Sequence, residues 1–476
     1  MKSLTIKKIY IFLLPIILFY GCSEDFLDVE SRERIEAEDS DEVFEPDHFI
    51  ISSYGMLTDW TYAFSYLGVT EIISDNADKG STPTSTGTDK HFLDGLTHTA
   101  TTPSIRAVWE HWYKSIGRAS YAIEYTEEYG LSDENYKNRL IAEAKFLRAL
   151  HYFWLVRAFG DVPLQHVDLL NRAPKEEVYD FIEQDLSDAI AALPNKSEYA
   201  SGDLGRATKG AAQALLAKVY LYKEQWEDAL NYANMVMTSG EYSLEPNYED
   251  IWRKYSENGV ESIFEVQARG EQIAHGVQQY SQTQAPRGTG GWGWGFNIPS
   301  EDLLNAFNAE GDTIRRDATI IFRGETLWDG REVSGSVENA MYNEKAYSSA
   351  NLGDSDGDKN VRILRLAEVL LIHAEAANEL GNASTALSSL NQVRSRVNLP
   401  EVTTTDQGQL RQLIWKERRL ELAFEHDRWF DLIRTGQAGN VMRTLGKPFE
   451  DGKHELFPVP NDQINQTPEM TQNPGW

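Results

Sequence analysis

The chain has 476 residues, of which 41% are hydrophobic and 11% aromatic, so it is long and apolar enough to bury a large core. It carries 74 acidic and 45 basic residues, a formal charge of −29, which argues against nucleic acid as a partner because that partner needs clustered lysine and arginine. The charge also argues, more weakly, against a strongly anionic ligand, and it is equally what the solubility of a surface protein requires.

The first residues have the pattern of a secretory targeting segment. A lysine-rich start precedes the apolar run Ile9 to Tyr20, which is too short to span a bilayer as an ordinary transmembrane helix. Cys22 follows and is the only cysteine, so no disulfide can form within the chain. We expect cleavage after Gly21 and lipidation of Cys22, which makes 1–21 a lipoprotein signal peptide and 22–45 a lipid-anchored tether. Ordinary cleavage that leaves a free cysteine is the alternative.

Apolar residues at helical spacing next predict a series of paired helices. The predicted helices in the first half of the chain are 47–60, 105–129, 138–159, 175–193, 207–222 and 226–239. Alanines within 217–233 allow close helix approach, as in the hairpins of tetratricopeptide repeats. A polar loop without periodicity, 75–88, interrupts the series.

Residues 242–360 have a different composition. Glycine and aromatic residues are frequent there, and only Ile263 to Val266 predicts a short strand. Helical spacing then returns: residues 365–399 predict two helices joined by a tight turn at Gly381, and two further helices are predicted over 410–424 and 428–432.

The predicted fold is therefore mainly α. Helical hairpins like those of tetratricopeptide repeats form a scaffold over 46–241 and 361–476, and a loop-rich insertion over 242–360 carries a few short strands. Together they form one domain over 46–476. A loop-rich excursion of this length in a compact protein is usually functional.

Several local sequences resemble the SusD/RagB family, in order and over essentially the whole chain. They are CSEDFLDV (Cys22–Val29), LRALHYFWLVRAFGDVPL (Leu147–Leu164), ILRLAEVLLIHAEAANELG (Ile363–Gly381), LNQVRSRVNL (Leu390–Leu399), ERRLELAFEHDRWFDLIRTG (Glu417–Gly436), LFPVP (Leu456–Pro460) and QNPGW (Gln472–Trp476).

The resemblance implies a bacterial surface lipoprotein that binds glycans or peptides as the lid of a TonB-dependent transporter of the SusC type. It implies a helical scaffold that faces the transporter and a variable, loop-rich part that holds the ligand. The acidic residues after Cys22 resemble the signal that exports such lipoproteins to the cell surface. We therefore expect an outer-membrane protein that contacts the membrane only through its lipid anchor.

No pattern of catalytic residues stands out. The ten histidines are scattered without paired metal-ligand spacing, and neither a nucleophile-elbow motif nor a phosphate-binding glycine loop occurs. The expectation is a protein that is not an enzyme and has no cofactor. A carbohydrate hydrolase is the alternative among enzymes, because sequence cannot show two carboxylates at glycosidase separation.

The most informative irregular run is Gln284 to Ile298, in which Trp292, Trp294 and Phe296 are separated by single glycines. On an extended segment these three rings would line one face. An indole offers a flat platform for the apolar face of a sugar ring at low rotamer cost. The competing interpretation is a buried aromatic cluster that closes the loops over the helices.

A sugar site also needs planar polar groups for vicinal hydroxyls. The candidates are Asp75, Asn76, Arg287 and Asn297, with Trp328 as a weaker candidate ring. Seven other tryptophans lie in or beside helical patterns and are assigned to packing: Trp60, Trp109, Trp112, Trp226, Trp252, Trp415 and Trp429.

Asp354, Asp356 and Asp358 are spaced like the start of a calcium loop, but no glutamate follows at the twelfth position. A solvated turn before the next helix is the stronger interpretation, and a calcium ion is the alternative.

The function expected from these observations is capture of an oligosaccharide or polysaccharide and its delivery to a SusC-type transporter. The acidic surface and the uncharged aromatic loop favour a neutral glycan, such as a β-glucan or a starch-like chain. Peptide capture would need a deeper groove with main-chain hydrogen-bonding groups. A purely structural lid would bury the loop tryptophans.

Overall fold

The computed structural model describes residues 45–165, 168–270, 276–349 and 357–476. The chain divides into two compact units, Met1–Glu45 and Pro46–Trp476, and every described helix and strand lies in the second. Cys22, the signal peptide and almost all of the tether lie outside the described residues. Within the described ranges, none of the helices combines the length and the apolarity needed to cross a membrane.

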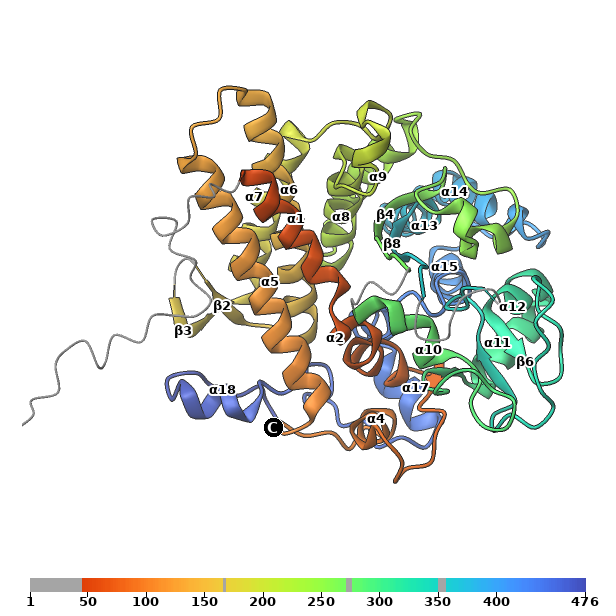
Figure 1. Ribbon diagram of the computed structural model, residues 1–476. Coiled ribbons are helices and arrows are strands. Elements are labelled where there is room, and N and C mark those ends of the chain that lie inside the picture. Colours follow the sequence, from red (N-terminus) through yellow and green to blue (C-terminus); the bar gives the residue numbers. More distant parts are fainter. Residues whose placement is uncertain (1–44, 166–167, 271–275, 350–356) are drawn as a thin grey trace, which may run out of the picture. The chain divides into compact units, whose positions relative to one another are not determined.

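Five long helices in the first half of the chain pack as consecutive neighbours (Figure 1). They are α5 (Pro103–Glu128), α6 (Glu134–Phe159), α7 (Lys175–Ala192), α8 (Lys209–Tyr222) and α9 (Trp226–Thr238). The second half of α6 is buried on all sides, because α5 and α7 both cover it. The prediction of a mainly helical scaffold is confirmed.

The two ends of α6 have local sequence signals, which is why this helix could be predicted from the sequence. The Asp133 carboxylate accepts hydrogen bonds from the N–H groups of Asn135 and Tyr136, at 3.0 and 3.1 Å, and caps the start. Gly160 follows the last residue with φ 71°, a conformation that favours glycine. The predicted end at residue 159 is therefore correct.

The hairpin predicted over 365–399 is formed by α13 (Leu366–Glu379) and α14 (Ala383–Arg396). Gly381 has φ 76° in the turn between them. Although α13 is far from α8 and α9 in sequence, it packs against both of them, and α15 (Gln407–Glu421) packs against α13. The two halves of the predicted scaffold thus share one hydrophobic core.

The remaining helices are short. They are α1 (Pro46–Gly55), α2 (Trp60–Ala63), α3 (Ser65–Leu67), α4 (Thr88–Asp94), α10 (Tyr280–Gln284), α11 (Glu301–Glu310), α12 (Thr313–Thr319), α16 (Arg428–Arg434), α17 (Ala438–Thr444) and α18 (Asn461–Gln466).

The strands form antiparallel pairs. They are β1 (Ala77–Asp78) with β5 (Ile298–Pro299), β2 (Val162–Leu164) with β3 (Asp168–Ala173), β4 (Ser262–Val266) with β8 (Val361–Arg365), and β6 (Ile320–Phe322) with β7 (Met341–Asn343). Two of these pairings connect the insertion to the scaffold. Strand β4 contains the strand predicted from residue 263, and its pairing with β8 joins the insertion to the start of the second scaffold segment. The pairing of β1 with β5 brings the early polar loop to the insertion.

One buried carboxylate joins the insertion to the scaffold. Glu421, the last residue of α15, pairs with Arg315 of α12 at 3.0 Å and with Arg365 at the end of β8 at 2.6 Å. Its carboxylate also pairs with Arg396, the last residue of α14. All four side chains are at most 3% exposed.

The backbone carbonyl of Glu421 also connects the insertion to the scaffold. As one of the last carbonyls of α15 it has no partner within the helix. It accepts hydrogen bonds from the Tyr248 hydroxyl at 2.9 Å, from Arg365 at 2.8 Å and from Lys345 at 3.1 Å. Tyr248 and Lys345 both belong to the insertion, so a single residue holds that part of the chain in several places.

Burial alone would raise the pKa of the Glu421 carboxyl. The guanidinium groups of Arg396, Arg365 and Arg315 outweigh burial and hold the pKa well below its ordinary value. The ionised carboxylate therefore stabilises the fold at every pH above its unfolded-state pKa of about 4.3. This contribution is lost as the pH falls through the lower folded-state pKa.

Replacing Glu421 by glutamine should destabilise the protein by about 3 kcal/mol at neutral pH, because three buried guanidinium groups lose their shared counter-charge. Urea unfolding followed by circular dichroism measures the loss. Asp462→Asn is the matched control, because Asp462 pairs with Arg106 at 2.7 Å with both side chains half exposed, and it should cost less than about 1 kcal/mol. The difference from wild type should shrink as the pH falls below about 4. Equal losses for the two variants would contradict the role assigned to Glu421.

Candidate functional site

The loop that carries Trp292, Trp294 and Phe296 is folded back rather than extended. The N–H groups of Trp292 and Gly293 both donate to the carbonyl oxygen of Pro286 at 2.8 Å. The N–H of Trp294 donates to the carbonyl oxygen of Gln282, in α10, at 2.9 Å. The prediction that the three rings line one face of an extended segment is wrong, because these hydrogen bonds turn the backbone between the rings.

Two of the three rings belong to one aromatic group, the Trp60 group (Trp60, Phe64, Trp294 and Phe296). The Trp60 ring stacks on Phe64 with centroids 5.3 Å apart and meets the edge of Trp294 at 5.7 Å. Phe64 in turn meets Phe296 at 5.2 Å. Trp60 is 36% exposed and Trp294 partly exposed, whereas Phe296 is buried. Two indoles therefore reach the surface, and two phenyl rings support them.

The Trp60 group rests on a short helix and a buried lysine. Asp59 caps α2 by accepting a hydrogen bond from the N–H of Thr61 at 2.7 Å, which places Trp60 at the first helical position. The Lys90 ammonium lies 3.4 Å from the centroid of the Phe64 ring. Burial lowers the pKa of Lys90 to about 8, against the opposing effect of Asp89.

The third loop ring belongs to a second group, the Trp292 group (Trp292, Tyr347 and Trp328). Tyr347 contacts both indoles, with its ring centroid 6.1 Å from that of Trp292 and 6.0 Å from that of Trp328. Arg331 lies over Trp292 and Arg253 over Trp328, each 4.5 Å from the ring centroid. Trp292 is partly exposed, and Trp328 is exposed.

Asp75 is fully buried at the point where the early loop meets the scaffold. Its carboxylate accepts two hydrogen bonds from Arg428, both at 2.7 Å, and lies 3.2 Å from Arg419. Burial would raise the pKa of Asp75, but Arg428 and Arg419 outweigh it and lower the pKa to about 2. Asn76 is also buried and accepts a hydrogen bond from Arg419 at 2.9 Å.

Asn297 is buried as well. Its side-chain amide donates to Gln284 at 2.9 Å, and Gln284 also accepts from Asn343 at 2.8 Å. The expectation of direct ligand contact for Asp75, Asn76, Phe296 and Asn297 is therefore corrected, since each of these residues is at most 4% exposed. They instead hold the loops that carry the exposed rings.

Arg287 stays partly exposed beside the loop. Its guanidinium pairs with Glu338 at 2.8 Å. Its side chain fills the space next to Gly295, where a Cβ atom would come within 2.5 Å of it. The same glycine meets the early loop: a Cβ on Gly80 would lie 2.2 Å from the Gly295 carbonyl oxygen. The two loops therefore touch through backbone at positions where only glycine fits.

Calcium finds little support among the described residues. Asp358 is buried, pairs with Lys254 and accepts a hydrogen bond from Ser348 at 3.2 Å. Asp354 and Asp356 lie outside the described residues. In the described ranges, no group of three or more histidine, cysteine, aspartate or glutamate side chains is placed to hold a metal ion.

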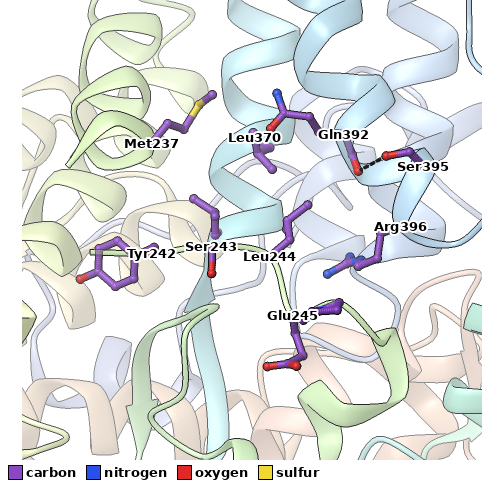
Figure 2. A pocket seen from close by; sticks show the side chains of 11 residues that line it. Met237, Tyr242, Ser243, Leu244, Glu245, Leu370, Gln392, Ser395 and Arg396 are labelled. Atoms are coloured by element: carbon purple, nitrogen blue, oxygen red, sulfur yellow. Dashed lines mark hydrogen bonds between the residues drawn. The ribbon is translucent and has the colours of Figure 1, made fainter. Parts of the chain in front are cut away.

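Two open cavities lie where the scaffold meets the insertion. The first, of about 500 Å³, is bounded by α9, α13, α14 and residues 242–246. Figure 2 shows Met237 and Leu370 at one end of it and Glu245 at the other, with Arg396 beside Glu245. The second, of about 550 Å³, is lined by Trp328 and Arg253, and Arg396 borders both cavities.

Comparison with known proteins identifies the family to which this chain belongs. Residues 25–221 match a family model described as "Starch-binding associating with outer membrane", and residues 328–476 match the SusD family model. A SusD-like protein P2 from Formosa agariphila is 30% identical over 417 residues, which cover 78% of this chain and 81% of that protein. The chain belongs to the SusD family.

Other relatives agree. A SusD-like protein of Bacteroides ovatus is 31% identical over 379 residues, 70% of this chain and 66% of the relative. Among solved structures, a laminarin binding SusD-like protein superimposes with a TM-score of 0.77 at 27% identity, over 90% of this chain and 99% of that one. The resemblance inferred from the local sequences is confirmed.

Two rings of the aromatic groups, Trp60 and Tyr347, and the supporting Arg253 could not be identified from the sequence of this SusD-family protein. Trp60 was assigned to packing, but α2 is a single turn and exposes its first residue. Tyr347 and Arg253 carry no local signal, since each depends on a ring distant in sequence.

Proposed function

We propose that this SusD-family protein captures a neutral oligosaccharide or polysaccharide at the cell surface and passes it to a TonB-dependent transporter of the SusC type. The observation that carries the proposal is a set of three exposed or partly exposed indoles. Trp292 and Trp294 lie on one folded loop, and Trp60 lies on α2 and contacts Trp294. A soluble protein seldom leaves several indoles at its surface without a binding role.

The chemistry of these rings supports a sugar ligand. A sugar ring has an apolar C–H face that stacks on an indole, and stacking needs little loss of side-chain freedom when the indole is already fixed. Trp60 is fixed by Phe64, and Trp292 by Tyr347 and Arg331. Binding is therefore expected to be shallow, with stacking for affinity and a few hydrogen bonds for selectivity.

The charges around the rings favour a neutral glycan. Arg287 is paired with Glu338, Lys90 with Asp89 and Arg253 with Glu344. These cations are already neutralised, and the whole chain has a formal charge of −29. A polyanionic glycan would therefore be repelled by this acidic field.

Relatives narrow the choice of test ligands. One matched family model is described as starch-binding, and one structural neighbour is a laminarin binding protein. We therefore propose an α-glucan or a β-glucan as the glycan, with laminarin and starch as the first two probes.

Affinity gels that contain laminarin, soluble starch or an acidic polysaccharide test the proposal with the chain from Ser23 to Trp476. Wild type should be retarded by one neutral glycan. Trp292→Ala, Trp294→Ala or Trp60→Ala should each weaken the retardation about tenfold or more, because each removes a stacking surface.

The control variant for these gels is Tyr121→Ala, which removes an exposed aromatic residue of the scaffold helix α5. It should leave the retardation unchanged. Unchanged melting temperatures separate lost binding from lost fold. If no polysaccharide retards wild type while a peptide library binds it, peptide capture replaces glycan capture as the function.

The lipid anchor at Cys22 is part of the same proposal, and it supplies the outer-membrane location that delivery to a transporter requires. Cys22→Ser should move the protein from the outer-membrane fraction to the soluble fraction, because a serine offers no thiol for lipidation. Immunoblots of fractionated cells measure the change. A Cys22→Ser protein that stays in the membrane fraction would rule out this anchor.

A further inference from the structure

Trp328 is the most exposed ring of the two aromatic groups, at 45%. It is also held from two directions. The guanidinium of Arg253 lies 4.5 Å from its centroid, and Tyr347 meets it at 6.0 Å. An indole that is fixed in place and yet open to solvent is a preorganised surface for an apolar face.

The support under this ring is rigid because it is buried. Arg253 is 4% exposed and pairs with Glu344 at 3.3 Å. Its backbone carbonyl accepts a hydrogen bond from Arg362 at 3.3 Å, and the Glu344 N–H donates to the carbonyl of Thr319 at 2.9 Å. Both partners are thus tied to the backbone of other elements.

Trp328 forms one wall of the second cavity, whose volume of about 550 Å³ is large enough for a sugar ring. Arg253 and Glu344 line its buried part. The exposed rim carries short polar side chains with hydroxyl, amide and carboxylate groups, the donors and acceptors that vicinal hydroxyls need: Asn247, Glu249, Thr313, Asp317 and Asn398.

The charges of the lining point to a neutral ligand. Four carboxylates line the cavity, Glu249, Asp317, Glu325 and Glu344, of which Asp317 pairs with Arg316 and Glu344 with Arg253. The two arginines are already paired, Arg253 with Glu344 and Arg396 with Glu261 at 2.7 Å and with Glu421. A uronic acid or a sulfated sugar would therefore meet net repulsion, whereas the hydroxyl groups of a neutral sugar can bond to carboxylates.

The cavity is linked to Trp292 through Tyr347, whose ring centroid lies 6.0 Å from that of Trp328 and 6.1 Å from that of Trp292. A glycan chain that lies on Trp292 can therefore continue past Tyr347 to Trp328. Two linked binding positions raise the affinity of a long chain much more than that of a short one.

We propose that the cavity beside Trp328 is a second sugar subsite, which takes a further neutral unit of a glycan that is already bound at Trp292. The inference rests on the proposed function and adds a length requirement to it. Trp328 supplies the stacking surface, the rim supplies hydrogen bonds, and Arg253 is a positioning residue that holds the indole.

Isothermal titration calorimetry with laminari-oligosaccharides and malto-oligosaccharides, from trisaccharide to octasaccharide, tests the subsite on the chain from Ser23 to Trp476. Wild-type affinity should rise with length in the series that binds. In Trp328→Ala the longest oligosaccharide should bind about tenfold more weakly, while the trisaccharide should bind as in wild type. Trp328→Phe should recover part of the loss, because a phenyl ring keeps some stacking area.

A second variant tests the rim. Asn398 has φ 56°, so Asn398→Gly removes the amide without straining the backbone. It should weaken binding of the longest oligosaccharide and leave the trisaccharide unaffected. The Tyr121→Ala variant should match wild type at every length, and all variants should keep the wild-type melting temperature.

Three results would overturn the subsite. Trp328→Ala that binds every length like wild type would show that the cavity is unused, and equal weakening at every length would make Trp328 part of the first binding position. Tighter binding of an oligouronide through Trp328 would refute the neutral ligand. A wild type that binds no oligosaccharide would instead sink the proposed function, and the inference with it.

Discussion

The fold depends on one buried carboxylate that several cations share. Glu421 ends α15 and holds Arg315, Arg365 and Arg396 around it, and its carbonyl binds Tyr248 and Lys345. Removing charges from water costs several kcal/mol per ion, and only close pairing with full hydrogen bonding offsets that cost. The geometry of the insertion is therefore tied to the geometry of the helices, because displacement of either would leave buried charge uncompensated.

The same helix also reaches the candidate binding loops. Arg419, two residues before Glu421, contacts Asp75 and Asn76 of the early loop, and Arg428 of α16 completes the pairing with Asp75. The early loop then pairs with the insertion through β1 and β5. These ion pairs and hydrogen bonds, which lie mostly beneath the surface, thus fix the position of the loops that carry the exposed indoles. They explain why loops without regular structure can present a fixed site.

The helices of the scaffold could be predicted from the sequence, because helix ends and apolar spacing are local signals. Gly160 and Gly381 ended helices where expected. The aromatic loop was mispredicted because alternation alone does not make a strand: hydrogen bonds from Trp292 and Gly293 back to Pro286 require a folded loop that local spacing cannot reveal.

The site was harder to predict than the scaffold for the same physical reason. The burial of Asp75 depends on arginines more than 340 residues away in sequence. The exposure of Trp60 depends on where α2 begins, and the setting of Trp328 depends on Arg253 and Tyr347. Contacts of this kind are formed only by the folded chain, so the sequence could indicate an aromatic loop on an acidic protein without showing which rings are exposed.

The central claim is that the exposed indoles bind a neutral glycan, and a crystal structure of the chain from Ser23 to Trp476 soaked with laminarihexaose, and separately with maltohexaose, tests it most directly. The account predicts density for one of the two oligosaccharides with a sugar ring stacked on Trp292, Trp294 or Trp60. Clear oligosaccharide density elsewhere, with all three indoles uncovered in crystals whose packing leaves them accessible, would contradict it.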